Sequence, residues 1–169
     1  MAIRLSRLAG LALIVAVPST AQSFASQFPA RVLAAHNAER AQAGVPPLGW
    51  DNGLGNAAAA YAQRLAITGR FDHSDQNSRA GTGENLWMGT HGAFPVEAMI
   101  GSWASEKRWF KPGIFPNVSR RGWQAVGHYT QMIWPTTQRV GCALASTPTT
   151  DYLVCRYAAA GNVMGGRVP

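Results

Sequence analysis

Apolar side chains in the first two thirds of the chain recur at helical spacing. The chain from Pro29 up to Gly44 is predicted to form a first helix, with Pro29 at its opening position and Gly44 just past its end. In residues 51–69 apolar positions recur every three or four residues, Asp51 can cap the start, and Gly69 closes the helix. The apolar stripe of this second helix comprises Leu54, Ala58, Tyr61 and Leu65.

A third helix is predicted from about Pro95. Glu106 flanks its apolar stripe on the side of Met99, whereas Lys107 would stand in the middle of the stripe. The helix is therefore expected to end near Lys107, or the lysine stem to lie along the apolar surface with its amine in water. The stripe comprises Val96, Met99, Ile100 and Trp103.

The second half of the chain has the pattern of strands and loops around one short helical segment. GENLWMG at 83–89 is strand-like, residues 111–123 form a loop rich in Pro, Gly and Arg, and the tail after residue 157 is expected to be coil. Between them GHYTQMIW, residues 127–134, is predicted to make one or two helical turns before Pro135 stops it. A histidine in such an apolar segment is more often a core residue than a ligand.

The chain contains two cysteines, Cys142 and Cys155, in the strand-like segments RVGCALAS and DYLVCRYA. The turn-rich linker STPTTD between them has Pro148 and Thr149 at its midpoint, and a hairpin folded there sets the two cysteines opposite each other. Opposed side chains on antiparallel strands are close enough for a disulfide, which an oxidising compartment would favour. The alternative is two buried thiols.

The N-terminal segment of residues 1–23 has the organisation of a secretory signal peptide. Two arginines form a basic start, an apolar run of ten residues follows, and small residues allow cleavage after Ala21 or Ser23. Ten apolar residues are too few to span a bilayer, which needs about 20. We therefore expect a secreted or periplasmic protein without a transmembrane segment, whose residues 24–169 form one domain.

Positive charge is spread along the chain and does not favour binding to nucleic acid. The formal net charge of +7 falls to +5 when the two arginines of the signal peptide are removed, and 11 of the 13 remaining basic residues are arginines. The densest basic stretch is expected to be a solvated face or to be attracted to an anionic lipid or cell-wall surface. It comprises Lys107, Arg108, Lys111, Arg120 and Arg121.

Four side chains suited to metal binding or catalysis are scattered along the chain. They are His73 in FDHSD, Glu84 in GENLW, Glu106 beside the third apolar stripe, and His128 in GHYTQ. The spacing of the two histidines does not match H-E-x-x-H, and the chain has no G-x-S-x-G nucleophile elbow. Spacing alone therefore gives little reason to place these residues in one site.

Six segments of the chain resemble the landmarks of one known family, in the family's order. HNAER, FDHS, GENLW and WASEKRWF are followed by GHYTQMIWPTTQRVGCA and YLVCRYAAAGNVMGG. The last two are similar to the signature motifs of the CAP superfamily, the cysteine-rich secretory, antigen 5 and pathogenesis-related proteins, whose module is also called the SCP domain. The match runs from about Phe28 to Gly166. The Ala- and Arg-rich composition and the single cysteine pair favour a bacterial single-domain member.

The resemblance implies an α+β fold, a three-layer α-β-α sandwich with a small antiparallel sheet between helices. It also implies a surface cleft in which some relatives bind zinc or another divalent cation, lined here by His73, Glu84, Glu106 and His128. Other relatives bind sterols, fatty acids or phospholipids in separate grooves. Many eukaryotic members carry three disulfides or a cysteine-rich tail that this chain lacks, so ion-channel regulation is not implied. Lys107 stands where relatives often have an apolar residue and is expected to reshape one wall of the cleft.

Two neutral imidazoles and two carboxylates supply donors with a net charge of −2, which suits one divalent ion with water completing its shell. The alternative is a hydrogen-bonded polar cluster that only ties helices to the sheet. We expect an exported binding module for a lipid, sterol, envelope glycan or protein partner. The alternative function is a metal-dependent hydrolase of peptide or cell-wall bonds, with Glu84 or Glu106 as the base. The residues leave open whether the protein is an enzyme.

Overall fold

A computed structural model describes the chain from residue 20 to residue 169, with its side chains from residue 27. The predicted signal peptide falls on residues 1–23, of which 1–19 lie outside the described residues, so it stays a prediction. The helices are α1 (Thr20–Gln42), α2 (Asn52–Thr68), α3 (Val96–Ala104) and α4 (Gly127–Met132), with 3₁₀ turns η1 (Gln76–Arg79), η2 (Ser105–Trp109) and η3 (Trp123–Ala125). The strands are β1 (Gly49–Trp50), β2 (Thr82–Thr90), β3 (Gly113–Ile114), β4 (Arg139–Ser146), β5 (Thr150–Ala158) and β6 (Arg167–Val168).

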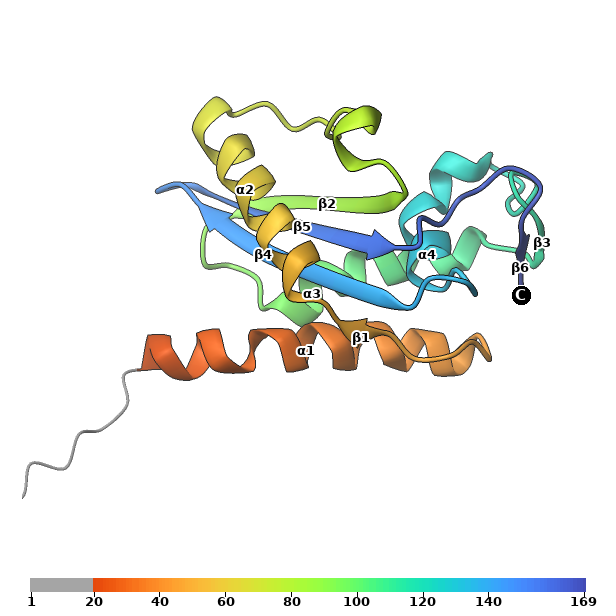
Figure 1. Ribbon diagram of the computed structural model, residues 1–169, viewed down its shortest axis with the longest axis horizontal. Coiled ribbons are helices and arrows are strands. Elements are labelled where there is room, and N and C mark those ends of the chain that lie inside the picture. Colours follow the sequence, from red (N-terminus) through yellow and green to blue (C-terminus); the bar gives the residue numbers. More distant parts are fainter. Residues whose placement is uncertain (1–19) are drawn as a thin grey trace, which may run out of the picture.

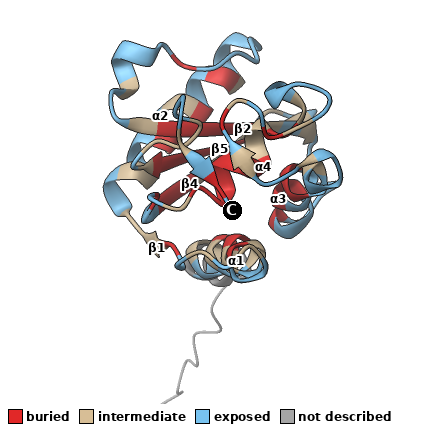
Figure 2. Cartoon of the chain, turned by 90° about the vertical axis from the view of Figure 1, so that its right-hand side faces the viewer, coloured by how far each residue is buried: buried red, intermediate tan, exposed pale blue. Residues whose placement is uncertain are grey.

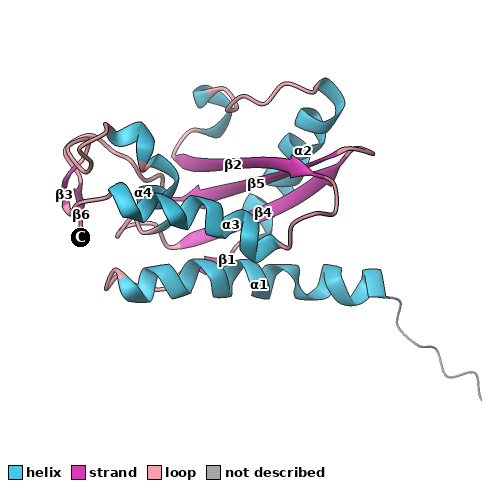
Figure 3. Cartoon of the chain, turned by 180° about the vertical axis from the view of Figure 1, so that it is seen from behind, coloured by secondary structure: helices cyan, strands magenta, loops and turns pink. Residues whose placement is uncertain are grey.

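Four strands form the central sheet in the order β1-β4-β5-β2. The long strands β4, β5 and β2 are antiparallel, and only the two-residue β1 pairs in parallel, with β4. Helix α2 lies on one side of this sheet and α1 on the other (Figure 1). Helix α3 lies on the face turned away from α2, as the view from behind shows (Figure 3). The predicted three-layer α-β-α sandwich is therefore confirmed, with a sheet that is antiparallel apart from β1.

Side-chain alternation along β5 divides the core into two clusters. Tyr152 and Val154 pack with Leu86 and the α2 residues, whereas Leu153 and Tyr157 pack with residues of α1, α3 and α4. The strands that separate the two clusters are the most buried part of the molecule in the end-on view (Figure 2). Because both faces of β5 are covered, the sheet forms the middle layer of the fold.

Helix α2 follows the predicted pattern. The side chain of Asp51 accepts a hydrogen bond from the backbone N–H of Leu54 at 2.8 Å, and Gly69 ends the helix with φ at 65°. The helix approaches β4 closely at Gly141, where a Cβ atom would collide with the backbone of Asp51 and Gly55. Small residues on both elements therefore set the distance between the first and second layers.

The first helix differs from its prediction, because α1 begins at Thr20 and contains Pro29 in its interior. Residues 20–28 contain no glycine or proline, so none of them stops a helix. Proline favours the first turn of a helix but does not require it, and the expected start at Pro29 is wrong.

The third helix ends as expected near Lys107, since α3 stops at Ala104 and continues as the 3₁₀ turn η2. The Lys107 amine lies 3.0 Å from the carboxylate of Glu39 and 3.3 Å from the side-chain oxygen of Gln42, both on α1. The expected coil at 111–123 and in the C-terminal tail is wrong at two points, because β3 and β6 pair there as short antiparallel strands.

The predicted hairpin is confirmed in β4 and β5, where Cys142 and Cys155 stand opposite each other and form a disulfide. The described residues include no free cysteine. None of the described helices is both long enough and apolar enough to cross a bilayer.

Candidate functional site

The candidate site lies at the edge of the sheet formed by β2. His73, Glu84 and His128 line one cleft of about 250 Å³. Glu84 points to the face of β2 that α2 covers, together with Leu86, while its neighbour Asn85 points to the opposite face. Glu106, on η2, lies against His128. The four predicted residues therefore form two His–Glu pairs that flank one edge strand.

The first pair joins the loop after α2 to strand β2. Nδ1 of His73 lies 2.7 Å from a Glu84 carboxylate oxygen, and the backbone N–H and hydroxyl of Ser74 donate to the same carboxylate at 3.0 Å each. Arg156, opposite Glu84 on β5, adds an ion pair at 3.0 Å. The Glu84 side chain is fully buried, whereas that of His73 is 53% exposed. The half-exposed ring of His73 is thus anchored by its hydrogen bond to the buried carboxylate of Glu84.

Glu84 is held in its charged form despite its burial. Burial raises the pKa of the Glu84 carboxyl, but the hydrogen bonds from His73 and Ser74 and the charge of Arg156 outweigh it, so the pKa lies below its ordinary value of 4.5. An ionised carboxylate can only accept hydrogen bonds, so Nδ1 of His73 must carry the hydrogen of this contact.

The second pair joins η2 to the start of α4. One oxygen of Glu106 accepts from the backbone N–H groups of His128 and Tyr129, at 3.0 Å each, and the other lies 2.6 Å from Nδ1 of His128. The first N–H groups of a helix have no partner within it, so Glu106 caps α4 from another element. The His128 ring stacks on Trp103 with the planes 14° apart. Both rings therefore use Nδ1 for a carboxylate, which leaves Nε2 as their remaining nitrogen.

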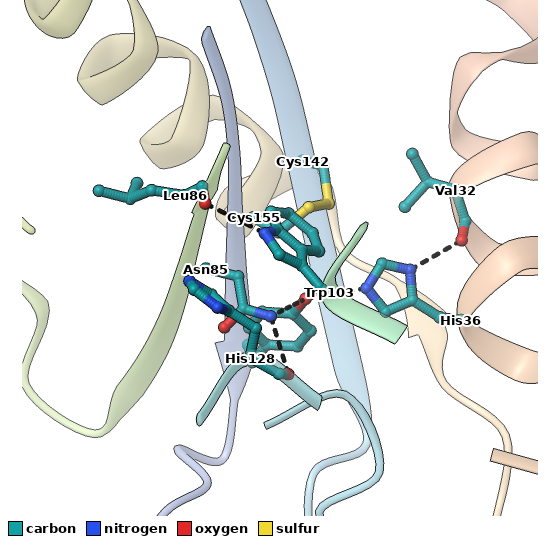
Figure 4. Close-up of a disulfide and its surroundings, with 9 residues drawn as sticks. Val32, His36, Asn85, Leu86, Trp103, His128, Cys142 and Cys155 are labelled. Atoms are coloured by element: carbon teal, nitrogen blue, oxygen red, sulfur yellow. Dashed lines mark hydrogen bonds between the residues drawn. A yellow bond between two sulfur atoms is a disulfide. The ribbon is translucent and has the colours of Figure 1, made fainter. Parts of the chain in front are cut away.

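A buried chain of hydrogen bonds supports the second pair from below (Figure 4). Nδ1 of His36 donates to the Val32 carbonyl at 2.8 Å, and its Nε2 accepts from the Tyr157 hydroxyl at 2.8 Å. The amide of Asn85 donates to that hydroxyl at 3.2 Å and to the His128 carbonyl at 3.1 Å. Since a carbonyl can only accept, Nδ1 of His36 carries a hydrogen. Burial lowers the pKa of His36 to about 4, so the ring is neutral at pH 7 and its Nε2 is the acceptor.

Sequence reasoning named the four site residues but missed those that hold them. Arg156, Asn85, Trp103 and His36 come from four different elements, and only the strand register and the packing bring them to the cleft. One available signal was the alternation of DYLVCRYA, which puts Arg156 on the face opposite Cys155, beneath a helix. A charged residue at a position covered on both faces needs a partner.

The two pairs are separate units of hydrogen bonding. Within the described part of the chain, no three His, Cys, Asp or Glu side chains are grouped closely enough to hold a metal ion. Each carboxylate instead accepts hydrogen bonds from its own histidine and from nearby N–H or O–H groups.

Comparisons with known proteins agree with the fold and the motifs. The model of the cysteine-rich secretory protein family, CAP, matches residues 33–157. The chain is 36% identical to pathogenesis-related protein 1B of Nicotiana tabacum over 156 residues, which are 92% of this chain and 86% of that protein. It is 34% identical to the human Golgi-associated plant pathogenesis-related protein 1 over 145 residues, 85% and 90% of the two chains.

Among solved structures, the chain resembles the crystal structure of NaASP2 with Zn²⁺, with a TM-score of 0.71 and 26% identity over 83% of each chain. Na-ASP-1, with a TM-score of 0.72 and 22% identity over 91% of this chain and 45% of that one, shares the fold. By its family model, its relatives and its fold, the chain belongs to the CAP family of cysteine-rich secretory proteins.

Proposed function

We propose that this protein is an exported CAP-domain binding protein whose cleft holds zinc or another divalent cation between His73 and His128. Glu84 and Glu106 belong to the same site, as the partners that orient the two rings. The observation that carries the proposal is the paired use of Nδ1, at 2.7 Å in one ring and 2.6 Å in the other, on two histidines that line one cleft.

The two histidines offer Nε2 as a metal ligand while their Nδ1 atoms contact carboxylates. A metal-binding histidine commonly donates its other ring N–H to a carboxylate, which fixes the tautomer and makes the ligating nitrogen more basic. Two imidazole nitrogens leave the remaining positions to water or to an external ligand, so the ion would bind more weakly than in a closed structural site. The solved relative NaASP2 has a crystal structure with Zn²⁺, which supports a similar ion here.

Binding without turnover is better supported than metal-dependent hydrolysis. A general base needs a carboxylate that is free to take a proton from water. Glu84 accepts three hydrogen bonds and an ion pair, and Glu106 accepts three hydrogen bonds. Both carboxylates are therefore already engaged by hydrogen-bond donors, and no observation specifically supports hydrolysis.

Export is proposed from the signal-like N-terminus together with the Cys142–Cys155 disulfide, since such bonds persist in oxidising compartments. The proposed partner is a lipid, a sterol, an envelope glycan or a protein, in keeping with a family that includes secretory and pathogenesis-related proteins. The predicted bacterial source stays a prediction.

Calorimetric titration with zinc tests the metal site. Wild-type protein should bind zinc at pH 7.5 and more weakly at pH 5.5, because protons compete with the metal for imidazole. His73→Ala or His128→Ala should each remove one ligand and lower the affinity sharply, and Glu106→Gln should lower it by about 10-fold or more through the loss of a carboxylate partner.

His91 supplies a matched control. Its Nδ1 lies 2.7 Å from the Asp151 carboxylate and its side chain is 50% exposed, which closely resembles the His73–Glu84 pair. His91 lies outside the cleft lining, so His91→Ala should leave zinc affinity at the wild-type value. Absence of zinc binding at pH 7.5, or an equal loss in the His91 variant, would show that the cleft is not a metal site.

A further inference from the structure

A second pocket lies on the far side of Glu84, over the sheet face that α2 covers. It has a volume of about 510 Å³ and lies between α2, the η1 turn and the strands β2 and β5. Three arginines line it, one from each of α2, η1 and β5, and no aspartate or glutamate is among the described residues of its lining. These arginines are Arg64, Arg79 and Arg156.

The guanidinium of Arg156 has a buried N–H donor without a hydrogen-bond acceptor. Its side chain is only 7% exposed, and its one ion pair is with Glu84. Its Nε is buried without a hydrogen-bond partner, and its guanidinium lies 5.4 Å from the centre of the Tyr61 ring. Burial is the main cause that lowers its pKa. A buried guanidinium in this state gains from a further anion beside it.

The other two arginines have guanidinium groups with unused donors. Nε and Nη1 of Arg79 donate to the carbonyls of Ser74 and Thr82 at 3.3 and 3.2 Å, which holds the group at the pocket without an acid. Arg64 is exposed, and no described residue accepts a hydrogen bond from its guanidinium. Among the described residues, Arg156 is therefore the one of the three arginines that forms an ion pair, and its partner Glu84 lies outside the pocket lining.

The first half of α2 gives the pocket an apolar wall, whereas Arg64 stands further along the same helix. Leu54, Ala57 and Ala60 line the pocket there, and the two alanines leave space for a small group above the helix. Guanidinium forks match the geometry of carboxylate and phosphate oxygens, while the alanine surface favours hydrocarbon. A pocket with these two sides suits a ligand that is charged at one end.

We propose that this pocket binds an organic oxyanion, a carboxylate or phosphate monoester carried on a small apolar group. Arg64 and Arg79 contact the anion, and Arg156 lies at the base of the pocket between the anion and Glu84. The pocket is separate from the histidine cleft, because neither His73 nor His128 lines it. The proposal therefore does not depend on metal binding.

Titration of metal-free protein with four small probes tests the ligand chemistry. Hexyl phosphate and hexanoate should bind, hexanol should not, and inorganic phosphate should bind at least about 10-fold more weakly than hexyl phosphate, because only the organic anions use both sides of the pocket. If hexanol bound as tightly as hexyl phosphate, the pocket would be apolar without recognising an anion. If inorganic phosphate bound as tightly as hexyl phosphate, the apolar group would contribute nothing to binding. Either result would overturn the proposal.

Matched charge variants test the location. Arg64→Gln should weaken hexyl phosphate binding by about 10-fold, since it removes a charged donor that has no structural partner. Arg120→Gln removes the same charge from an exposed position outside the lining and should leave binding unchanged. His128→Ala should also bind the probe normally, which separates this pocket from the metal site. Wild-type binding by Arg64→Gln, or an equal loss in Arg120→Gln, would contradict the assignment.

Discussion

The two His–Glu pairs are alike in chemistry and different in their support. In the first pair Glu84 is fully buried and is balanced by Arg156, a second charge within the sheet. In the second pair Glu106 is 20% exposed and is held by two backbone N–H groups at the start of α4. The His73–Glu84 pair is stabilised by an ion pair, whereas the His128–Glu106 pair is stabilised by the N-terminus of a helix.

The same arrangement of ring and carboxylate therefore has a different free-energy cost of disruption in each pair. A buried ion pair is costly to break because the remaining charge has no water around it. A carboxylate that caps a partly exposed helix start can be replaced by solvent at a smaller cost. The first pair is therefore expected to matter more for folding, although both rings are oriented in the same way.

The largest predicted effect comes from removing each carboxylate charge in turn. Glu84→Gln leaves Arg156 buried without its counter-ion and should lower the free energy of unfolding by about 3–5 kcal/mol. Glu106→Gln has the same shape change but keeps an oxygen that can accept from the backbone, so its cost should be about 1 kcal/mol. Urea unfolding of metal-free protein at pH 7.5 measures both, and equal losses would remove the distinction between the pairs.

The next predicted effect concerns the neutral network beneath His128. The pKa of His36 is about 4 in the folded protein against 6.5 in an unfolded chain, so the unfolded state binds the proton more readily. Its contribution is complete above pH 6.5 and is lost as pH falls towards 4. The expected loss of unfolding free energy is about 2 kcal/mol by pH 5.

Comparison with His36→Gln isolates the contribution of the buried His36 ring. Glutamine can still donate to Val32 and accept from Tyr157 but does not titrate, so the variant should lose about 2 kcal/mol less than wild type between pH 7.5 and pH 5. The lowered pKa of Glu84 acts in a more acidic range, because its contribution is lost only as pH falls below the ordinary carboxyl value of 4.5. Identical pH profiles for wild type and His36→Gln would contradict the buried-histidine account.

The elements that the sequence predicted well depend on local patterns. The 3.6-residue stripe and the Asp51 cap are sufficient to define α2, and a hairpin of period two centred on Pro148 and Thr149 places Cys142 opposite Cys155. Such features need only the chemistry of neighbouring residues. The start of α1 was wrong because Pro29 is a preference for a helix start and not a stop signal.

The residues that hold the site in place could not be predicted from local patterns. Glu84 and Arg156 are 72 residues apart, and their contact depends on β2 lying beside β5 in one register. A shift of one residue would turn Arg156 to the other face of the sheet. The four site residues came from the family resemblance, whereas their division into two Nδ1-linked pairs depends on this long-range register.

The smallest predicted effect tests whether the second pair extends to its neighbour Lys107. This lysine was expected to reshape a wall of the cleft, but its amine pairs with Glu39 on α1, and its side chain is 44% exposed. Exposed ion pairs contribute about 0–1 kcal/mol, so Lys107→Met should lower the free energy of unfolding by less than about 1 kcal/mol. Zinc affinity should stay within about twofold of wild type, because a charge directed at α1 and screened by water has little effect on the His128 nitrogen. Urea unfolding and calorimetry on the variant measure the two quantities. A loss of zinc affinity as large as that of Glu106→Gln would mean that Lys107 belongs to the site and that the second pair is a charged network like the first.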